Sequence, residues 1–245
     1  MPQLLQNNNT LFLYGHRGLS GHYLENTLSS FKYAIECGMD GIELDVQKTL
    51  DQELVVFHDK SLVKIDNSII PITNIAYDDL KNINLNRNNL NIHPEYIPKL
   101  SEIIEILPKS MVLNIELKFY DRVKQNIELN IVKLFEKYDL YGNTIVSSFN
   151  PFSLHAIKRL NSKIPLALIW NGKTKFIYFW LKCLKPSAIH MDINYVNSKI
   201  ISWMQSMNLQ VYSYTVNHNP EYMKAKKYKL DGIFTDFNSF NEQSN

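Results

Sequence analysis

Short apolar runs rich in β-branched residues recur along the chain, and between most of them lie segments with the apolar spacing of amphipathic helices. Helical crossovers return each strand to the same end of a sheet, so this alternation predicts a parallel sheet. Eight runs have the character of its strands: residues 11–14, 41–46, 111–117, 144–148, 166–169, 188–190, 210–214 and 232–235.

Eight strand–helix units favour closure of the sheet into a TIM (β/α)8 barrel, for which roughly 250 residues are typical. The chain has 245 residues, so we expect one barrel domain over residues 1–245. The last ten residues, DFNSFNEQSN, are too few and too polar for a full closing helix. We therefore expect the eighth helix of the barrel to be truncated.

An insertion is predicted after the second strand unit. Residues 53–57 are strand-like, but they follow the strand at 41–46 after too few residues for a parallel crossover. This spacing predicts a hairpin return, and we expect residues 54–58 to stand over the C-terminal mouth of the barrel. Residues 59–98 are polar and include an Asn-rich stretch, so we expect an insertion or lid of irregular structure.

Two of the predicted strands carry polar side chains where a barrel strand is normally apolar on both faces. Glu43 and Asp45 are two residues apart and share one face of their strand, while Asn114, Glu116 and Lys118 share a face of another. If both faces point into the barrel, three carboxylates converge at its mouth and need a cation between them. Oxygen ligands of this kind suit Mg²⁺ or Ca²⁺. The alternative is a pair of solvated strand ends, or an ion pair of Glu116 with Lys118.

Two histidines are expected at the same mouth. His16 and Arg17 follow the first strand between two glycines, where barrel enzymes have their active-site loops, and His58 ends the predicted hairpin return. Arg17 and Lys118 are suited to bind phosphoryl oxygens, and the two imidazoles are suited to move protons. The pattern therefore indicates metal-assisted chemistry on a phosphate-containing substrate.

Composition argues against several other classes of protein. The formal net charge is +2, from 26 basic and 24 acidic residues, which is too balanced for a broad nucleic-acid-binding surface. Cys37 and Cys183 lack the spacing of a disulfide framework or a zinc site. The most apolar run, residues 176–184, is too short to span a bilayer, and the N-terminus lacks the features of a secretory signal. We therefore expect no stable membrane insertion and a cytoplasmic location.

A series of short motifs runs from about residue 11 to residue 236. The motifs are HRG at 16–18, ENT at 25–27, GIELDV at 41–46, VVFHD at 55–59, IPKL at 97–100, NIELK at 114–118, SSF at 147–149, YTVN at 214–217 and DGIFTD at 231–236. Each motif is weak alone, but HRG, ENT, ELD, HD and IELK in this order are specific. Together the motifs resemble those of the glycerophosphodiester phosphodiesterase family.

The resemblance implies a TIM barrel with a small insertion after the HD motif. It also implies hydrolysis of glycerophosphodiesters, which are small-molecule substrates, to an alcohol and glycerol 3-phosphate. In such an enzyme His16 and His58 would be the general acid and base, in an order that the resemblance leaves open. Glu43, Asp45 and Glu116 would bind the divalent metal.

The same resemblance assigns the phosphate contacts to Arg17 and Lys118. It also suggests that Glu25 orients Arg17 or His16 from behind the site. The residues after Asp59, KSLVKIDNS, depart from the usual family pattern, so the preferred alcohol is not implied.

Other functions are compatible with parts of the pattern. A lysophospholipase D would keep the chemistry and use a lipid substrate, and the aromatic run FIYFW at 176–180 favours it, although we interpret that run as a barrel helix that packs on the sheet. A catalytically silent barrel that serves as a binding module would require the loss of a catalytic residue type, and none is missing. A two-carboxylate glycosidase leaves both histidines and Arg17 unexplained.

Overall fold

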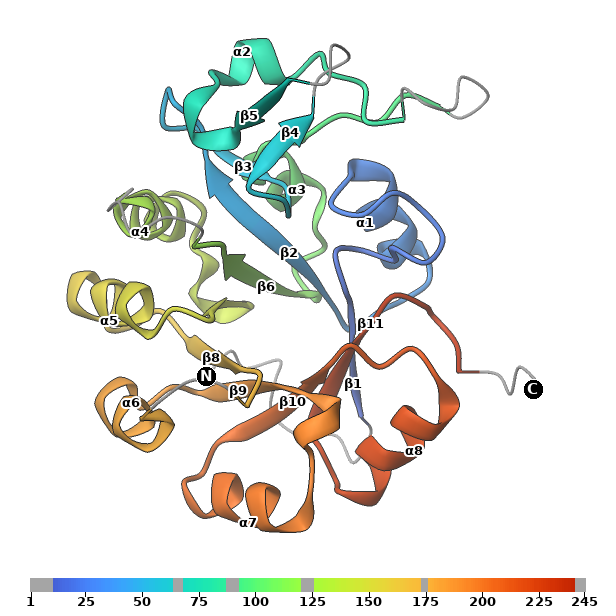
Figure 1. Ribbon diagram of the computed structural model, residues 1–245, viewed down its shortest axis with the longest axis vertical. Helices are drawn as coiled ribbons and strands as arrows, with labels where there is room; N and C mark the ends of the chain where they lie inside the picture. The colour runs from blue at the N-terminus through green and yellow to red at the C-terminus, as the bar shows by residue number, and fades with distance from the viewer. Residues whose placement is uncertain (1–10, 64–67, 87–92, 120–125, 173–175, 241–245) are drawn as a thin grey trace.

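Eight parallel strands form a closed barrel in the computed structural model, which describes residues 11–63, 68–86, 93–119, 126–172 and 176–240. The barrel closes because β1 pairs with β11 on one side and with β2 on the other (Figure 1). The predicted TIM barrel is confirmed, with a strand at each of the eight expected places. The strands are β1 (Phe12–Gly15), β2 (Gly41–Lys48), β6 (Val112–Leu117), β7 (Thr144–Ser148), β8 (Leu166–Trp170), β9 (Ala188–Asp192), β10 (Gln210–Tyr214) and β11 (Gly232–Thr235).

Helices connect the strands along the outside of the barrel (Figure 1). Helix α1 illustrates how the sequence places them: the Thr27 hydroxyl accepts a hydrogen bond from the Ser30 backbone amide, and the Ser30 hydroxyl accepts one from the Thr27 amide. This capping box begins the helix, and Phe31 and Ala34 are buried on its inner face. The connecting helices are α1 (Leu28–Glu36), α3 (Leu100–Ile106), α4 (Ile127–Tyr138), α5 (Pro151–Leu160), α6 (Ile177–Leu184), α7 (Ser198–Ser206) and α8 (Asn219–Lys227), with 3₁₀ turns η3 (Leu140–Gly142) and η4 (Ile193–Tyr195).

The predicted hairpin return is strand β3 (Leu54–Val56), which pairs antiparallel with the end of β2. The insertion that follows is more regular than expected. It contains a two-stranded sheet of β4 (Ser61–Val63) and β5 (Ile69–Pro71), the 3₁₀ turn η2 (Ile72–Asn74) and the short helix α2 (Tyr77–Leu80). Its apolar residues form a small core of their own with β3, which explains the regularity. This core includes Val55, Leu62, Ile72, Ile75, Leu80 and Ile97.

The closing helix is absent through residue 240, as expected, and residues 241–245 lie outside the described part of the chain. Residues 236–240 instead pack on helix α8 and on the loop between β1 and α1. The ring of Phe240 stacks on Tyr222 of α8 with 4.4 Å between ring centroids, and Phe237 contacts the ring of His22. Aromatic packing therefore covers part of the surface that an eighth helix would bury.

A layer of apolar side chains fills the inside of the barrel. Seven strands each contribute one buried residue, and the ring of Tyr14 occupies the space beside Gly41, the glycine that begins β2. Side chains two residues further along each strand point to the same side, so the next layer toward the carboxyl ends contains His16, Glu43 and Asn114. The polar groups therefore lie directly above an apolar floor, which is made by Tyr14, Val112, Ile145, Ala167, Ala188, Tyr212 and Phe234.

No helix in the described part of the chain combines the length and the apolar character that a bilayer-spanning segment requires.

Candidate active site

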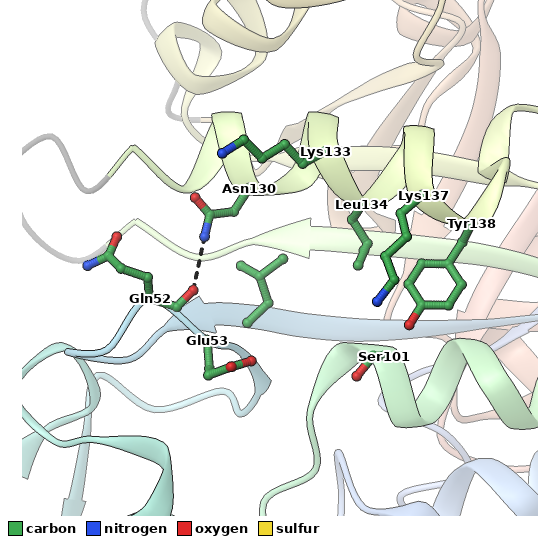
Figure 2. Close-up of a pocket in the computed structure, with 9 residues that line it drawn as sticks. Gln52, Glu53, Ser101, Asn130, Lys133, Leu134, Lys137 and Tyr138 are labelled. Carbon is green, nitrogen blue, oxygen red and sulfur yellow. Dashed lines mark hydrogen bonds between the residues drawn. The ribbon is translucent and has the colours of Figure 1, made fainter.

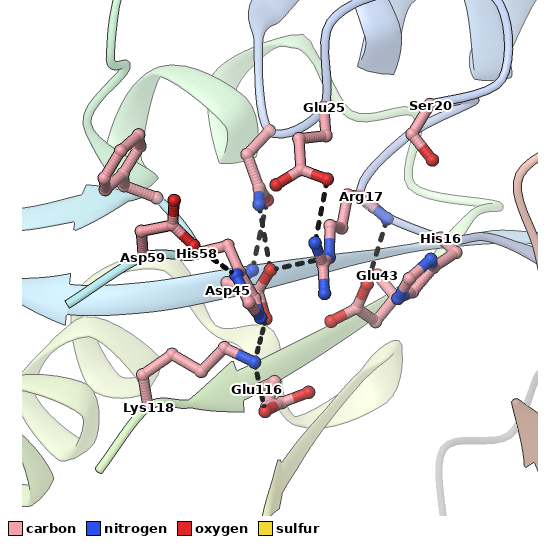
Figure 3. A network of polar contacts seen from close by, with 12 residues as sticks. His16, Arg17, Ser20, Glu25, Glu43, Asp45, His58, Asp59, Glu116 and Lys118 are labelled. Atoms are coloured by element: carbon pink, nitrogen blue, oxygen red, sulfur yellow. Dashed lines mark hydrogen bonds and ion pairs between the residues drawn. The ribbon is translucent and has the colours of Figure 1, made fainter. Parts of the chain in front are cut away.

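Strands β2 and β6 bring the three predicted carboxylates together at the C-terminal end of the barrel (Figure 3). The two strands pair in parallel, with Glu43 opposite Asn114 and Asp45 opposite Glu116. One carboxylate oxygen from each of Glu43, Asp45 and Glu116 lies within 4.8 Å of the others. The expectation that both polar faces point into the barrel is therefore met.

Lys118 lies between two of these carboxylates. Its Nζ is 2.8 Å from Asp45 Oδ1 and 2.7 Å from Glu116 Oε1. The ion pair with Glu116, which the sequence left open as an alternative, is thus present as one part of a larger network. Burial acts to lower the pKa of Lys118, but the charges of Glu116 and Asp45 outweigh it and raise the pKa. Lys118 therefore stays charged at the mouth.

Arg17 joins the first strand to the carboxylate cluster. Its backbone amide donates to Glu43 Oε2 at 2.9 Å, its Nε lies 3.0 Å from Asp45 Oδ2, and its Nη1 donates to Glu25 Oε2 at 2.8 Å. The turn requires a left-handed backbone at Gly18, with φ of 84°, and an added Cβ there would clash with the side chain and backbone of Ser30. Of the two contacts considered for Glu25, the structure has the one with Arg17.

The buried carboxyl groups of Glu43 and Asp45 differ in pKa. Burial and the neighbouring charges of Asp45 and Glu116 raise the pKa of Glu43 to about 8. For Asp45, burial acts in the same direction, but Lys118 and Arg17 reverse it and hold the pKa below its usual value. Within the described residues, Glu43 Oε1 and the nearby Asn114 Oδ1 are buried without a hydrogen-bond partner. Unpartnered buried oxygens beside crowded carboxylates are a donor set that suits a hard divalent cation.

His16 is oriented by a carboxylate from the last strand. Its Nδ1 lies 2.7 Å from Oδ1 of Asp236, which follows β11, and the His16 backbone amide donates to the carbonyl of Thr235. Burial acts to lower the pKa of His16, but the hydrogen bond to Asp236 and the charge of Glu43 outweigh it and raise the pKa. The Asp236 carboxylate also accepts hydrogen bonds from Ser20 Oγ and Asn217 Nδ2. Asp236 therefore engages Nδ1 of His16 and leaves Nε2 as the ring nitrogen that is available to other groups.

His58 reaches the mouth from the hairpin return, as predicted. Its Nδ1 lies 2.9 Å from Asp59 Oδ1. His58 lines an open cleft of about 470 Å³ together with Glu116, Lys118 and a group of aromatic residues that includes Phe119, Phe149 and Phe152. The cleft thus joins one predicted catalytic imidazole to the carboxylate cluster.

A second hollow, of about 250 Å³, lies on the outside of the barrel beside the β2–β3 turn and helices α3 and α4 (Figure 2). The amide of Asn130 donates there to the backbone carbonyl of Gln52 at 2.9 Å. None of the predicted site residues lines this hollow. The candidate active site is therefore the cleft at the mouth of the barrel.

Comparison with known proteins identifies the family of this chain. A model of the glycerophosphoryl diester phosphodiesterase family matches residues 16–239. The chain belongs to this family. It is 30% identical over 233 residues to a glycerophosphodiester phosphodiesterase of Bacillus altitudinis, a match that covers 92% of this chain and 94% of that protein.

Other family relatives add detail on fold and substrate. The solved structure of an Oleispira antarctica phosphodiesterase in complex with the product sn-glycerol-3-phosphate superimposes with a TM-score of 0.83, at 26% identity and 92% coverage of both chains. A human lysophospholipase D is 25% identical over 263 residues, covering 91% of this chain and 82% of that protein. The expected resemblance is thereby confirmed, and so is the expectation of a phosphodiesterase enzyme.

The family motifs contain two site residues that the sequence analysis did not assign. Asp236 ends the DGIFTD motif, and Asn26 is the middle residue of ENT. Asn26 Nδ2 donates to Asp45 Oδ2 at 2.9 Å, and Asn26 Oδ1 accepts from the Asp45 backbone amide at 3.2 Å. For Asp236 a signal was available, because a carboxylate directly after a barrel strand lies at the active-site end.

Proposed function

We propose that this chain hydrolyses glycerophosphodiesters to an alcohol and glycerol 3-phosphate, with His16 and His58 as general acid and base. The observation that carries the proposal is the convergence of three carboxylates and the Asp236-bound imidazole at the barrel mouth, with the second imidazole on the adjoining cleft. The product complex of the Oleispira relative supports the same substrate class.

A divalent cation, Mg²⁺ or Ca²⁺, would be held by Glu43, Asp45 and Glu116. The unpartnered Glu43 oxygen and the raised pKa of that carboxyl fit this role, because a nearby cation removes the like-charge repulsion. When bound, the cation supplies Lewis-acid polarisation of the phosphoryl group and neutralises negative charge.

The two imidazoles divide the proton transfers. With Nδ1 engaged by Asp236, His16 uses Nε2 toward the substrate, and His58, with Nδ1 on Asp59, lines the adjoining cleft. One imidazole deprotonates the attacking group, a water or the glycerol 2-hydroxyl, for in-line attack on phosphorus, and the other protonates the oxygen of the leaving alcohol. Attack by water gives glycerol 3-phosphate directly. Attack by the 2-hydroxyl gives a cyclic phosphate, which a water then opens at the bond to the 2-oxygen to give glycerol 3-phosphate.

The cationic side chains bind the phosphate. Arg17 and Lys118 are each held by carboxylates at the mouth, so their positions are set before the substrate arrives. Charge-assisted hydrogen bonds from both would orient the phosphoryl oxygens and stabilise charge that builds up on them. Glu25 keeps the Arg17 guanidinium in place and is a positioning residue.

Release of glycerol 3-phosphate from glycerophosphocholine tests the proposal. We expect activity to be lost in EDTA and to return with Mg²⁺ or Ca²⁺. His16→Ala and His58→Ala should each lose about 10²–10⁴-fold in kcat, the usual contribution of one acid or base. The exposed His155 on α5 offers a matched control, and His155→Ala should retain full activity. Activity that is indifferent to EDTA would contradict the metal site, and a near-normal His58→Ala enzyme would contradict the acid–base assignment.

A lysophospholipase D activity is the second candidate. Three exposed aromatic residues line the cleft beside Glu116: Phe119, Phe149 and Phe152. Their rings could contact an apolar leaving group. The human relative at 25% identity has this activity by name. Comparison of kcat/KM for glycerophosphocholine and lysophosphatidylcholine separates the two functions, because only the second substrate carries an acyl chain.

A further inference from the structure

Helix α6 lies between α5 and α7 on the outside of the barrel (Figure 1). Several aromatic side chains on it are exposed. Phe176, Tyr178 and Phe179 are 78%, 50% and 56% exposed. The ring of Phe152 meets Trp180 with 4.7 Å between centroids, and Trp180 meets Phe179 at 5.3 Å. Phe176, Tyr178, Phe179 and Trp180 lie at the start of α6 and along it, and Phe152 lies at the adjoining end of α5; we call these five residues the α6 aromatic face.

The barrel uses only a small part of helix α6. Leu181 and Leu184 are its buried residues, whereas nearly every other position except Lys182 is also apolar. The interpretation of this run as a helix is confirmed, but packing on the sheet accounts for only one side of it. A contiguous apolar patch on a protein surface usually marks an interaction site. The exposed side of α6 therefore has the character of an interaction surface.

Charge indicates what kind of partner this is. Residues 140–191, which span β7 to β9, contain seven basic residues and no Asp or Glu, whereas the other 193 residues contain 19 basic and 24 acidic residues. Lys182 also lies over the ring of Tyr178, with its Nζ 4.4 Å from the centroid. Five of the seven basic residues belong to the described part of the chain: Lys158, Arg159, Lys163, Lys182 and Lys185.

Aromatic and basic side chains together, without acidic ones, are the composition of a surface that binds anionic lipid. A second copy of the chain would bring the net-positive stretch of residues 140–191 against the same stretch of its partner, which like-charge repulsion opposes. The face also adjoins the active site, because Phe152 lines the cleft that contains His58 and Glu116. A bilayer on this face would therefore lie next to the mouth of the barrel.

We propose that the α6 aromatic face docks the enzyme peripherally on a bilayer that contains anionic lipid. The aromatic rings would enter the headgroup region, while the lysine side chains would contact lipid phosphates. Docking at this position would bring the cleft beside phosphodiesters released from, or still embedded in, the membrane. Vesicle binding needs no turnover, so docking and hydrolysis are tested separately.

Cosedimentation with vesicles of phosphatidylcholine alone, and with a third of phosphatidylglycerol, tests the docking. We expect binding to the anionic vesicles only, weakened by salt. Phe176→Ser combined with Phe179→Ser should weaken this binding roughly tenfold or more, because two aromatic rings that would enter the headgroup region are removed. Met223 on α8 is 55% exposed, so Met223→Ser is a matched control that should bind like the wild type. Both variants should retain wild-type activity on glycerophosphocholine.

A measurement on the unmodified enzyme keeps the proposal testable if the double variant does not fold. Trp180 and Trp203 lie at or beside the face, and they are two of the three tryptophans of the chain. Their fluorescence should shift to the blue with anionic vesicles and be quenched by brominated lipid. Equal binding to neutral and anionic vesicles, undiminished binding by the double variant, or a dimer that this variant dissociates would each overturn the proposal.

Discussion

Replacement of Asp236 by Asn tests the carboxylate–imidazole pair most directly. The side chain changes little in size but loses its charge, beside three hydrogen-bond donors on His16, Ser20 and Asn217. Burial acts to raise the pKa of Asp236, yet these partners, with His16 first, lower it from 3.8 to about 2. Because one pKa unit corresponds to about 1.4 kcal/mol, ionised Asp236 adds about 2 kcal/mol to the free energy of unfolding at neutral pH.

The stabilisation by the pair of His16 and Asp236 is lost both at low pH and at high pH. The pKa of Asp236 is lowered in the folded state, so its contribution is complete above about 3.8 and is lost as the pH falls toward 2. The pKa of His16 is raised, so its contribution is complete below 6.5 and is lost as the pH rises through the raised value. The stability difference between the wild type and Asp236→Asn should therefore be largest between about pH 4 and 6.5.

Urea unfolding of the EDTA-treated proteins measures this difference, and the pH–rate profile measures its catalytic consequence. Without the Asp236 charge the pKa of His16 falls, so the limb of the profile that belongs to His16 should move to lower pH. Asp192 at the end of β9 accepts from Asn194 rather than from an imidazole, so Asp192→Asn is the control. An Asp236→Asn enzyme with unchanged stability and an unchanged profile would refute the reasoning.

Three further changes have defined outcomes. Because the pKa of Glu43 is about 8, metal binding at pH 7 should release close to one proton, and metal binding at pH 9 should release fewer. Calorimetry in buffers of different ionisation enthalpy measures this release. Glu43→Gln should release no proton and should bind the metal at least about tenfold more weakly. Gly18→Ala should cost about 2–4 kcal/mol because its Cβ clashes with α1, whereas Gly38→Ala, also at positive φ but with open space, should cost about 1 kcal/mol by urea unfolding. Asn26→Gly keeps a backbone with φ of 58° and removes both hydrogen bonds to Asp45, so it should lose about 1–3 kcal/mol in the same assay, and a neutral result would contradict a positioning role.

The strands and the carboxylate cluster could be predicted from sequence because both follow from a period of two residues. Glu43 and Asp45 had to share a face, and so did Glu116 and Lys118, whatever the rest of the chain did. Parallel strands of a closed barrel then place both faces at one end. By contrast, the contact of His16 with Asp236 depends on barrel closure, which joins residues 220 positions apart, and no local pattern encodes it.

The insertion and helix α6 were predicted less completely than the barrel strands, because local periodicity does not show which of their apolar residues are buried. In the insertion, expected to be irregular, six apolar residues that are scattered in sequence meet in a core with β3, which periodicity over short runs does not reveal. In α6 the apolar residues occupy all sides of the helix, so periodicity identified the helix but could not distinguish its buried side from its exposed one.

The apolar floor of the barrel links stability to the chemistry above it. Tyr14 and Phe234 stack with 4.8 Å between ring centroids, and their strands continue into His16 and Asp236. The side chains of His16 and Asp236 are therefore both positioned by strands that are held together by ring packing. A shift between β1 and β11 would separate His16 Nδ1 from the Asp236 carboxylate. Phe234→Leu should therefore lower kcat and leave KM nearly unchanged. Phe234→Tyr keeps an aromatic ring, so rescue of kcat by this variant would show that ring packing, and not general destabilisation, is the cause.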